Sequence, residues 1–315
     1  MDNILVSVVI PTFNKSRLIQ STLRSICNQT YKNIELILVD NGSSDSTRAE
    51  IDEFLSTNHV KFKILDLKEN KGPSNARNQG IINSSGNYIF LLDGDDLFMP
   101  EKISIQVDFM ERNPEVGLSL TPYFIYSKPK KPIRLIKNLN VRSLISNWLH
   151  MTGFGGLVES TGCIRRSAIN SSLFFNLAFM GSEGLDFTKK WSDQSCVKVL
   201  PEPLTIYRLS PNGLHYDTIA IRENVSRLVK VYETSQSQRS RSLRIQNEYF
   251  KLDILRAKPK IEIIMSILSS IFTFDTPALF MISVIVRRNF AAYFRGLGYK
   301  KSVLSCLRLA EQVND

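Results

Sequence analysis

Cysteine is scarce in this sequence, and the residues present lack the spacing of a metal site or a redox motif. The N-terminus also lacks the basic residues and the long apolar segment of a signal peptide, because its first apolar run ends at Pro11. These absences predict free thiols in a reducing compartment, and hence a cytoplasmic protein. The four cysteines are Cys27, Cys163, Cys196 and Cys306.

Glycine and proline are also few, at 15 and 12 of 315 residues, and the chain has neither a low-complexity stretch nor an internal repeat. This composition excludes a disordered chain and a repeat protein. Hydrophobic residues make up 43% of the sequence and aromatic residues 10%. That is enough to build the core of one large or two modest globular domains.

Positive charge is concentrated in the C-terminal third of the chain. The formal net charge is +10, and between Arg222 and Arg308 there are 16 Lys and Arg against 6 Asp and Glu. This asymmetry indicates an anionic partner, either nucleic acid or an acidic membrane face; the alternative is a solvated basic surface. Nucleic acid is not expected, because few aromatic side chains are interleaved with the basic ones for base stacking.

The apolar stretch 261–274, "IEIIMSILSSIFTF", lies within this basic region. Its fourteen residues are too short to span a bilayer. Polar residues such as Glu262 and Ser266 fall on one helical face, with Ile261 and Leu268 opposite, so we expect an amphipathic helix. Such a helix would lie on an anionic membrane surface, pack on the protein's own core, or contact an oligomer partner.

Strand and helix patterns alternate regularly over the first hundred residues. Runs rich in β-branched residues predict buried strands, and the stretches between them have the apolar spacing of helices. This alternation predicts an α/β fold with a doubly wound, mostly parallel sheet flanked by helices. After it we expect a helix over Met99–Arg112, then helices and short strands that extend the same sheet, and a C-terminal helical extension. The four predicted strands are Val6–Pro11, Ile34–Asp40, Val60–Leu67 and Asn87–Asp93.

The fourth predicted strand ends in three acids, Asp93, Asp95 and Asp96. Ligands of parallel α/β sheets bind outside the carboxyl ends of the strands. Asp93 and Asp95, separated by the small Gly94, can direct their oxygens to one point, as a hard divalent cation requires. Magnesium or manganese normally keeps several waters and takes phosphate oxygens from a substrate, so the pair predicts a phosphate-rich substrate. The alternative is an Asp-rich turn that caps the next element.

Two further stretches fall on the same edge of the predicted sheet. Asp40 ends the second strand, where an acid accepts hydrogen bonds from a base or ribose, or else forms an Asx turn with Asn41 and Gly42. Arg77 and Asn78 lie near the start of the third predicted helix, where helix N-termini and basic side chains favour phosphate. The alternative there is an ordinary capped surface helix.

These motifs occur in one order: "SVVIPTFNKSRLIQSTLRSICNQTYKNIELILVDNGSSDST", then "ENKGPSNARNQGI", then "GNYIFLLDGDD". In order and spacing the sequence resembles the family 2 glycosyltransferases with a GT-A fold, over Ser7–Asp96 and more weakly to Tyr207. The resemblance implies inverting, Mn²⁺- or Mg²⁺-dependent transfer of a sugar from a nucleotide diphosphate donor to an acceptor hydroxyl. The implied acceptor is a cell-surface saccharide or a lipid-linked oligosaccharide, reached from the inner face of the cell membrane.

The resemblance also implies how the chain is organised. Residues 1–220 would form the GT-A domain, with a nucleotide-binding half at 1–98 and an acceptor half at 99–220. Residues 221–315 would form the basic helical extension, in contact with a membrane surface or an oligomer partner.

Roles for individual residues follow from the same resemblance. Asp40 would bind the nucleobase. Asp93 would meet the ribose or the metal, and Asp95, beyond Gly94, would be the main metal ligand, with Asp96 in support. The residues that line the nucleotide, its base or its diphosphate would be Pro11, Thr12, Asn14, Arg77 and Asn78.

Inversion in one displacement needs a base that takes the acceptor's proton. In the family this is usually the Asp of a Glu-Asp pair, and the corresponding stretch here is "GSEGLDF". Glu183 matches the Glu, but Gly184 stands where the Asp is expected. Glu183 is therefore the first candidate base and Asp186 the second. The alternative is that both acids merely cap or flank a helix, in a catalytically impaired relative that binds nucleotide sugars. Arg208 and His215 resemble a tail motif that approaches the diphosphate.

Overall fold

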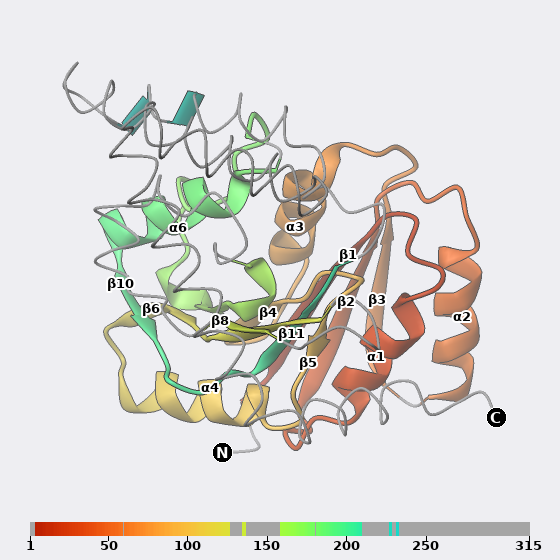
Figure 1. Ribbon diagram of the computed structural model, residues 1–315, viewed down its shortest axis with the longest axis horizontal. Coiled ribbons are helices and arrows are strands. Elements are labelled where there is room, and N and C mark those ends of the chain that lie inside the picture. Colours follow the sequence, from red (N-terminus) through yellow and green to blue (C-terminus); the bar gives the residue numbers. More distant parts are fainter. Residues whose placement is uncertain are drawn as a thin grey trace, which may run out of the picture.

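Figure 1 shows the computed structural model of the protein, which describes residues 4–58, 60–126, 134–136, 158–179, 181–209, 227–228 and 231–232. His215, Cys306 and the predicted amphipathic stretch 261–274 lie outside these residues, as does most of the predicted C-terminal extension. Among the described residues, no helix combines the length and the hydropathy needed to cross a membrane. Cys27, Cys163 and Cys196 are free thiols.

A seven-stranded sheet forms the centre of the molecule, with helices on both of its faces (Figure 1). All neighbouring strands in it are parallel except for β9, which runs antiparallel to both of its neighbours. The predicted mostly parallel α/β fold is therefore confirmed. In spatial order the strands are β10 (Cys196–Val199), β6 (Val116–Leu120), β9 (Cys163–Arg165), β4 (Tyr88–Leu91), β1 (Val6–Thr12), β2 (Ile34–Asp40) and β3 (Lys61–Asp66).

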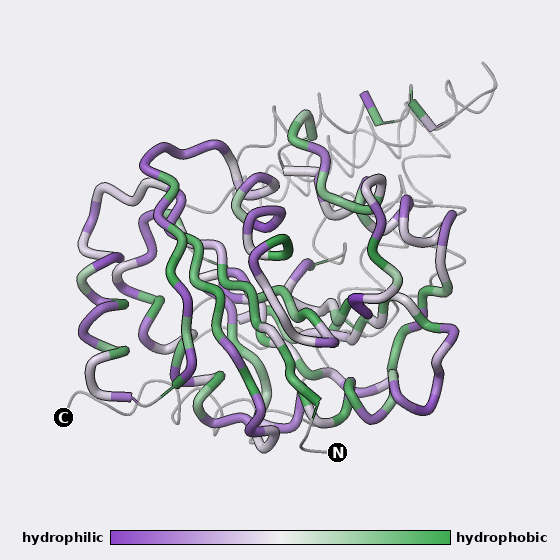
Figure 2. The backbone as a smooth tube through the Cα atoms, turned by 180° about the vertical axis from the view of Figure 1, so that it is seen from behind, coloured by the Kyte–Doolittle hydropathy of each residue, from purple (hydrophilic) through white to green (hydrophobic). Residues whose placement is uncertain are grey.

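Alternation along the central strands divides the core into two layers, because successive side chains of a strand point to opposite faces. Val8 and Ile10 of β1 pack on one face, and Val9 between them packs on the other. The first face is covered by α1 (Ile19–Cys27), α2 (Thr47–Thr57) and α4 (Lys102–Arg112). The second face is covered by α3 (Gly72–Ile82) and α6 (Glu183–Gln194). Figure 2 shows the hydrophobic stretches on the central strands and mostly hydrophilic loops between the elements.

A second, four-stranded sheet corrects the prediction that the short strands of the later stretches extend the first one. That prediction is right for β9 and β10 and wrong for β11, which lies in the second sheet. The first sheet has no room beside β4, because β1 and β9 already pair with both of its edges. The chain therefore turns away after Asp93, and β5 pairs with β11 instead. In spatial order the second sheet is β5 (Leu97–Phe98), β11 (Thr205–Arg208), β7 (Tyr123–Tyr126) and β8 (Arg134–Ile136).

Helix boundaries differ slightly from those predicted. Helix α4 begins at Lys102 rather than at Met99. The backbone N–H of Met99 donates to the carbonyl of Leu204 at 3.0 Å, so this residue continues the extended pairing of the second sheet. Helix α3 begins at Gly72 with Pro73 in its first turn, where the missing N–H of proline costs no hydrogen bond.

Candidate active site

The carboxyl ends of β1, β2 and β4 bring most of the predicted site residues together. Thr12 is paired in register with Asp40 across β1 and β2. The backbone N–H of Gly94 donates to the carbonyl of Pro11 at 3.2 Å, and Thr22 of α1 donates its hydroxyl to the carbonyl of Gly94 at 3.0 Å. The acidic turn after β4 is thus fixed against the end of β1.

The loops after β1 and β2 are also tied to each other. Asn14, with φ of 52°, accepts a hydrogen bond from the backbone N–H of Ser44 at 2.9 Å. Asp40 is buried, and one of its carboxylate oxygens accepts from the backbone N–H of Ser43 at 3.0 Å. Gly42 between them has φ of 76°, a conformation that favours glycine. Asp40 thus shapes its own loop, as in the Asx-turn alternative, while it lies at the ligand edge of the sheet.

Of the three acids after β4, Asp93 and Asp95 are partly exposed and Asp96 is buried. Asp93 accepts from Arg77 with both oxygens, at 2.8 and 2.9 Å, and Asp95 pairs with Lys15 at 2.5 Å. Their side chains are 22% and 14% exposed. Asp96 is fully buried and accepts from the hydroxyl of Ser160 at 2.6 Å. Burial, with the charges of Asp95 and Asp93, raises the pKa of Asp96 well above its usual range. Asp93 and Asp95 are therefore the accessible pair, and Asp96 supports the turn from inside.

The accessible pair fits a cation that is shared with a phosphate substrate. In the described part of the chain, no group of three or more His, Cys, Asp or Glu residues is arranged to hold a metal ion. A magnesium or manganese ion that keeps its waters and takes phosphate oxygens needs only one or two carboxylates. Asp93 and Asp95 supply two hard oxygen donors of this kind, each now neutralised by Arg77 or Lys15.

Arg77 on α3 is the centre of a buried group of charges that we call the Arg77 cluster: Arg77, Asp93, Glu159 and Glu183. Its guanidinium lies 2.9 Å from Glu183 and 3.8 Å from Glu159, in addition to its contacts with Asp93. Burial disfavours its charge, but the three carboxylates hold the pKa of Arg77 well above its ordinary value. Arg77 thus holds the acidic turn to α6 and to the segment at residue 159, at the edge where its predicted role at the nucleotide would place it.

Asn78, predicted to line the base or diphosphate, is held by two hydrogen bonds within the protein. Its side-chain amide donates to the carbonyl of Phe175 and accepts from the backbone N–H of the same residue, both at 2.9 Å. This pair of bonds ties α3 to the segment that precedes α6. The amide is thereby used within the protein and is not directed at the ligand edge.

Of the predicted catalytic acids, the structure brings only Glu183 to the Arg77 cluster. One oxygen of Glu183 accepts from Arg77, and the other is buried. Asp186, one turn further along α6, pairs with Lys190 at 2.7 Å and accepts from the hydroxyl of Tyr232 at 2.6 Å. The contacts of Asp186 with Lys190 and Tyr232 are thus separate from those of the Arg77 cluster.

Arg208 of β11 acts as a clamp on the acidic turn. Its guanidinium donates to the backbone carbonyl of Asp95, to the hydroxyl of Ser21 at 2.6 Å and to that of Thr22 at 2.8 Å. Its backbone N–H donates to Asp96 at 3.0 Å. Arg208, predicted to approach the diphosphate, thus bridges the acidic turn and α1. His215, predicted with it, lies outside the described residues.

Glu159 is a site residue that the sequence analysis missed. It begins a single 3₁₀ turn, η2 (Glu159–Thr161), directly beside the acidic turn. Burial, with the charges of Glu183 and Asp93, raises the pKa of Glu159 to about 7 against the attraction of Arg77. The signal available in the sequence was a single charged residue in the otherwise uncharged stretch 151–164.

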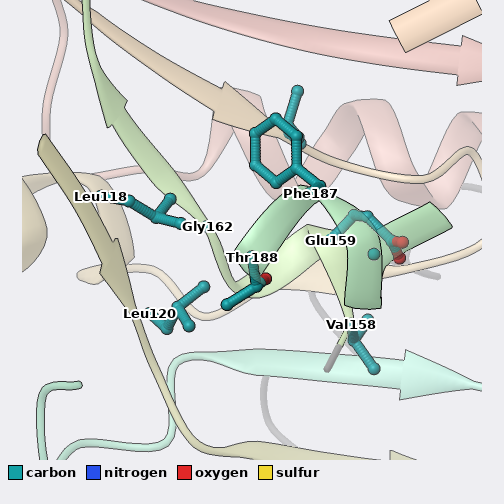
Figure 3. Close-up of a pocket in the computed structure, with 9 residues that line it drawn as sticks. Leu118, Leu120, Val158, Glu159, Gly162, Phe187 and Thr188 are labelled. Atoms are coloured by element: carbon teal, nitrogen blue, oxygen red, sulfur yellow. The ribbon is translucent and has the colours of Figure 1, made fainter. Parts of the chain in front are cut away.

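A small pocket lies beside Glu159 and α6 (Figure 3). Apolar side chains dominate its lining, and the carboxylate of Glu159 points away from Leu118 and Leu120. Glu159 therefore directs its carboxylate toward Arg77, and the apolar pocket lies on the other side of its side chain. The lining residues are Leu91, Leu118, Leu120, Val158, Glu159, Gly162, Gly184, Phe187 and Thr188.

Comparison with known sequences agrees with this geometry. The model of the family described as "Glycosyl transferase family 2" matches residues 7–170. The chain is 36% identical over 113 residues to the Escherichia coli protein WfgD, named a UDP-Glc:alpha-D-GlcNAc-diphosphoundecaprenol beta-1,3-glucosyltransferase, covering 36% of this chain and 44% of WfgD. It is 43% identical over 109 residues to an uncharacterized glycosyltransferase of Rickettsia felis, covering 34% of this chain and 17% of that protein. The chain thus spans less than half the length of these two relatives.

Two solved structures share the fold at low identity. Staphylococcus aureus TarS 1–349 in complex with UDP-GlcNAc has a TM-score of 0.58 at 16% identity, covering 78% of this chain and 72% of that one. The mannosyltransferase PcManGT of Pyrobaculum calidifontis, in complex with GDP-Man and Mn²⁺, has a TM-score of 0.57 at 16% identity, covering 97% and 85%. Both likenesses concern the arrangement of the chain in space.

Proposed function

Because the chain belongs to the family 2 glycosyltransferases, we propose that it transfers a sugar from a nucleotide diphosphate donor to an acceptor hydroxyl. The observation that carries the proposal is the convergence of Pro11, Asp40 and the turn Asp93–Asp95 at the carboxyl ends of three neighbouring parallel strands. This is the edge where α/β sheets bind nucleotides.

The nucleoside part of the donor would lie over the ends of β1 and β2. Asp40 would accept hydrogen bonds from the base, with Pro11, Thr12 and Asn14 along the nucleotide. The interlocked loops support this assignment, because a binding loop that is already fixed loses less entropy when ligand binds. Gly42, with φ of 76°, adds no side chain to this loop beside Asp40.

Asp93 and Asp95 would hold Mn²⁺ or Mg²⁺ together with the diphosphate. When bound, the cation neutralises charge on the departing diphosphate. Arg77 and Lys15 would then keep the two carboxylates in position or pass to the phosphate oxygens. The donor set supports such a shared site, since it offers two accessible carboxylates and no complete cage among the described residues.

Transfer would proceed with inversion, by one displacement at the anomeric carbon that requires a nearby base. The geometry favours Glu183 over Asp186 as a participant, since Glu183 joins the Arg77 cluster and Asp186 is paired with Lys190 and Tyr232. A catalytically impaired relative is the second candidate function. The glycine at position 184, where the resembling family has its base, favours that alternative.

The acceptor would be a cell-surface saccharide or a lipid-linked sugar. WfgD is named for an acceptor on diphosphoundecaprenol, and a second Escherichia coli relative, WfaP, carries the same enzyme name at 38% identity over 123 residues. An enzyme acting on such an acceptor would work at the inner face of the membrane. The surplus of positive charge after Arg222 would favour an anionic lipid surface there.

A thermal-shift experiment on the full chain tests the proposed function. UDP and GDP are added with Mn²⁺ or with a chelator, and one of them should raise the melting temperature only when Mn²⁺ is present. At a hundredfold excess over Kd the gain is about 2.7 kcal/mol, which corresponds to a shift of roughly 4 °C for a chain of this length. Asp95→Asn should remove the shift, whereas Asp52→Asn on the exposed face of α2 should leave it.

Two results would contradict the proposal. One is stabilisation that is equal with and without metal, which would remove the role given to Asp95. The other is the absence of any shift with either nucleotide.

A further inference from the structure

We propose that Glu159 is the general base of this enzyme and that its carboxylate does the work expected of an aspartate at position 184. The inference rests on the proposed transferase function and adds the identity of its base. It also explains why a glycine at position 184 is compatible with catalysis.

The space beside Gly184 is the first observation. A Cβ built on Gly184 would lie 3.1 Å from the carboxyl carbon of Glu159 and would overlap its oxygen Oε1. No side chain can therefore occupy position 184 while Glu159 keeps its place. The carboxylate that the family carries on α6 is here supplied from η2, to the same region of space.

The backbone at Glu159 is fixed to the proposed metal turn, which is the second observation. The hydroxyl of the neighbouring Ser160 accepts from the backbone N–H of Asp93 at 3.0 Å and donates to Asp96 at 2.6 Å. The hydroxyl of Thr205 donates to the carbonyl of Ser160 at 3.0 Å. Glu159 is thus held at a constant distance from the turn that would bind the diphosphate, as a catalytic group requires.

The third observation is that, of the three carboxylates around Arg77, that of Glu159 lies farthest from the guanidinium. Its side chain is 15% exposed, against 6% for Glu183, and its approach to Arg77 is the longest of the three, at 3.8 Å. Glu183 instead accepts a direct hydrogen bond of 2.9 Å from Arg77. Glu183 is therefore a positioning residue that orients Arg77, and Glu159 is free to accept a proton.

In the proposed step one bond forms at the anomeric carbon and one bond breaks there. The acceptor's hydroxyl oxygen forms a bond to the anomeric carbon, and its proton passes to the carboxylate of Glu159. The bond between the anomeric carbon and the donor's phosphate oxygen breaks, and its electron pair leaves with the nucleoside diphosphate. Glu159 then returns the proton to solvent, and water can replace the acceptor as a slow substrate.

The test measures release of nucleoside diphosphate, with water as the acceptor, from UDP-Glc, UDP-GlcNAc and GDP-Man in the presence of Mn²⁺. Glu159→Gln should lower the rate by about 10²–10⁴-fold and should leave the Mn²⁺-dependent thermal shift in place. The double variant E159A/G184D returns a carboxylate to the family's position and should recover a large part of the rate. The matched control is Glu115→Gln, an exposed acid in the loop before β6, which should behave as the wild type.

The outcomes separate the inference from the proposed function. If the wild type neither binds a nucleotide with Mn²⁺ nor cleaves a donor, the proposed function fails and the inference fails with it. If the wild type cleaves a donor and Glu159→Gln does so equally fast, the inference alone is overturned. If E159A/G184D does not recover the rate lost in Glu159→Gln, and Glu183→Gln loses the rate equally, the base is assigned to Glu183 instead.

Discussion

Replacing Glu159 with glutamine should stabilise the protein at pH 8 and have a smaller effect at pH 5. Burial, with the charges of Glu183 and Asp93, raises the pKa of Glu159 from its ordinary 4.5 to about 7, and Arg77 offsets this only in part. Between these pH values the folded protein keeps a proton on Glu159 that the unfolded chain has released. Glutamine has the shape of the neutral acid and does not ionise.

The sign of the effect follows from proton linkage. Where the folded state binds more protons than the unfolded state, stability falls as the pH rises, here from about 4.5 to about 7. One pKa unit corresponds to about 1.36 kcal/mol, so the full penalty on the wild type is roughly 3 kcal/mol. Most of it, roughly 2–3 kcal/mol, accumulates between pH 5 and pH 8. Titrating groups remote from position 159 are common to both proteins and cancel in the difference.

Urea unfolding of the two proteins at several pH values between 5 and 8, in metal-free buffer, measures this difference. The unfolding free energy of Glu159→Gln should exceed that of the wild type by an amount that grows by roughly 2–3 kcal/mol over the range. Glu115→Gln, which replaces an exposed acid, should show no such growth. A constant gap, or a variant that is the less stable protein at pH 8, would refute the reasoning.

Two further variants test the supports of the site. Arg77→Lys should lower the unfolding free energy at pH 8 by about 3–5 kcal/mol, because one ammonium group cannot pair with both Asp93 and Glu183 and a buried charge is left uncompensated. Its urea midpoint should recover toward that of the wild type at pH 5, and a loss that is independent of pH would contradict this account. Gly42→Ala should cost about 1–3 kcal/mol, since φ is 76° and the new Cβ would meet the backbone of Glu69 and Asn70 at 2.9–3.0 Å. An unchanged melting temperature would show that this loop relaxes freely.

Glu159→Gln is expected both to gain stability in urea unfolding and to lose activity in donor cleavage. A charged group that is poorly accommodated in the fold is a common cost of a working active site. If Glu159→Gln gains stability above neutral pH and loses donor cleavage, both effects have one physical origin, the ionised carboxylate in a largely buried place.

Much of the first half of the chain could be predicted from the sequence. The strands β1 and β2 lie within a residue of their predicted bounds, because a buried parallel strand must be apolar over its whole length and such a run is visible locally. Pro11, Asp40 and Asp93 could be placed at one edge for the same reason, since the ends of parallel strands meet there.

The second sheet could not be predicted in this way. Strands β5 and β11 have two and four residues, and they pair across more than a hundred positions of sequence. Short strands carry little periodicity. β5 pairs with β11 because both edges of the preceding strand β4 are already paired within the first sheet.

The sequence alone determined the α/β class, the position of the acidic turn and the family motifs, because these depend on local patterns of apolar and acidic residues. Only the tertiary structure decided that Arg77 pairs with both Asp93 and Glu183, and that Glu159 occupies the space beside Gly184. Arg77 and Glu183 are 106 residues apart, and Asp93 and Ser160 are 67 apart. Contacts across such separations are set by how the elements pack.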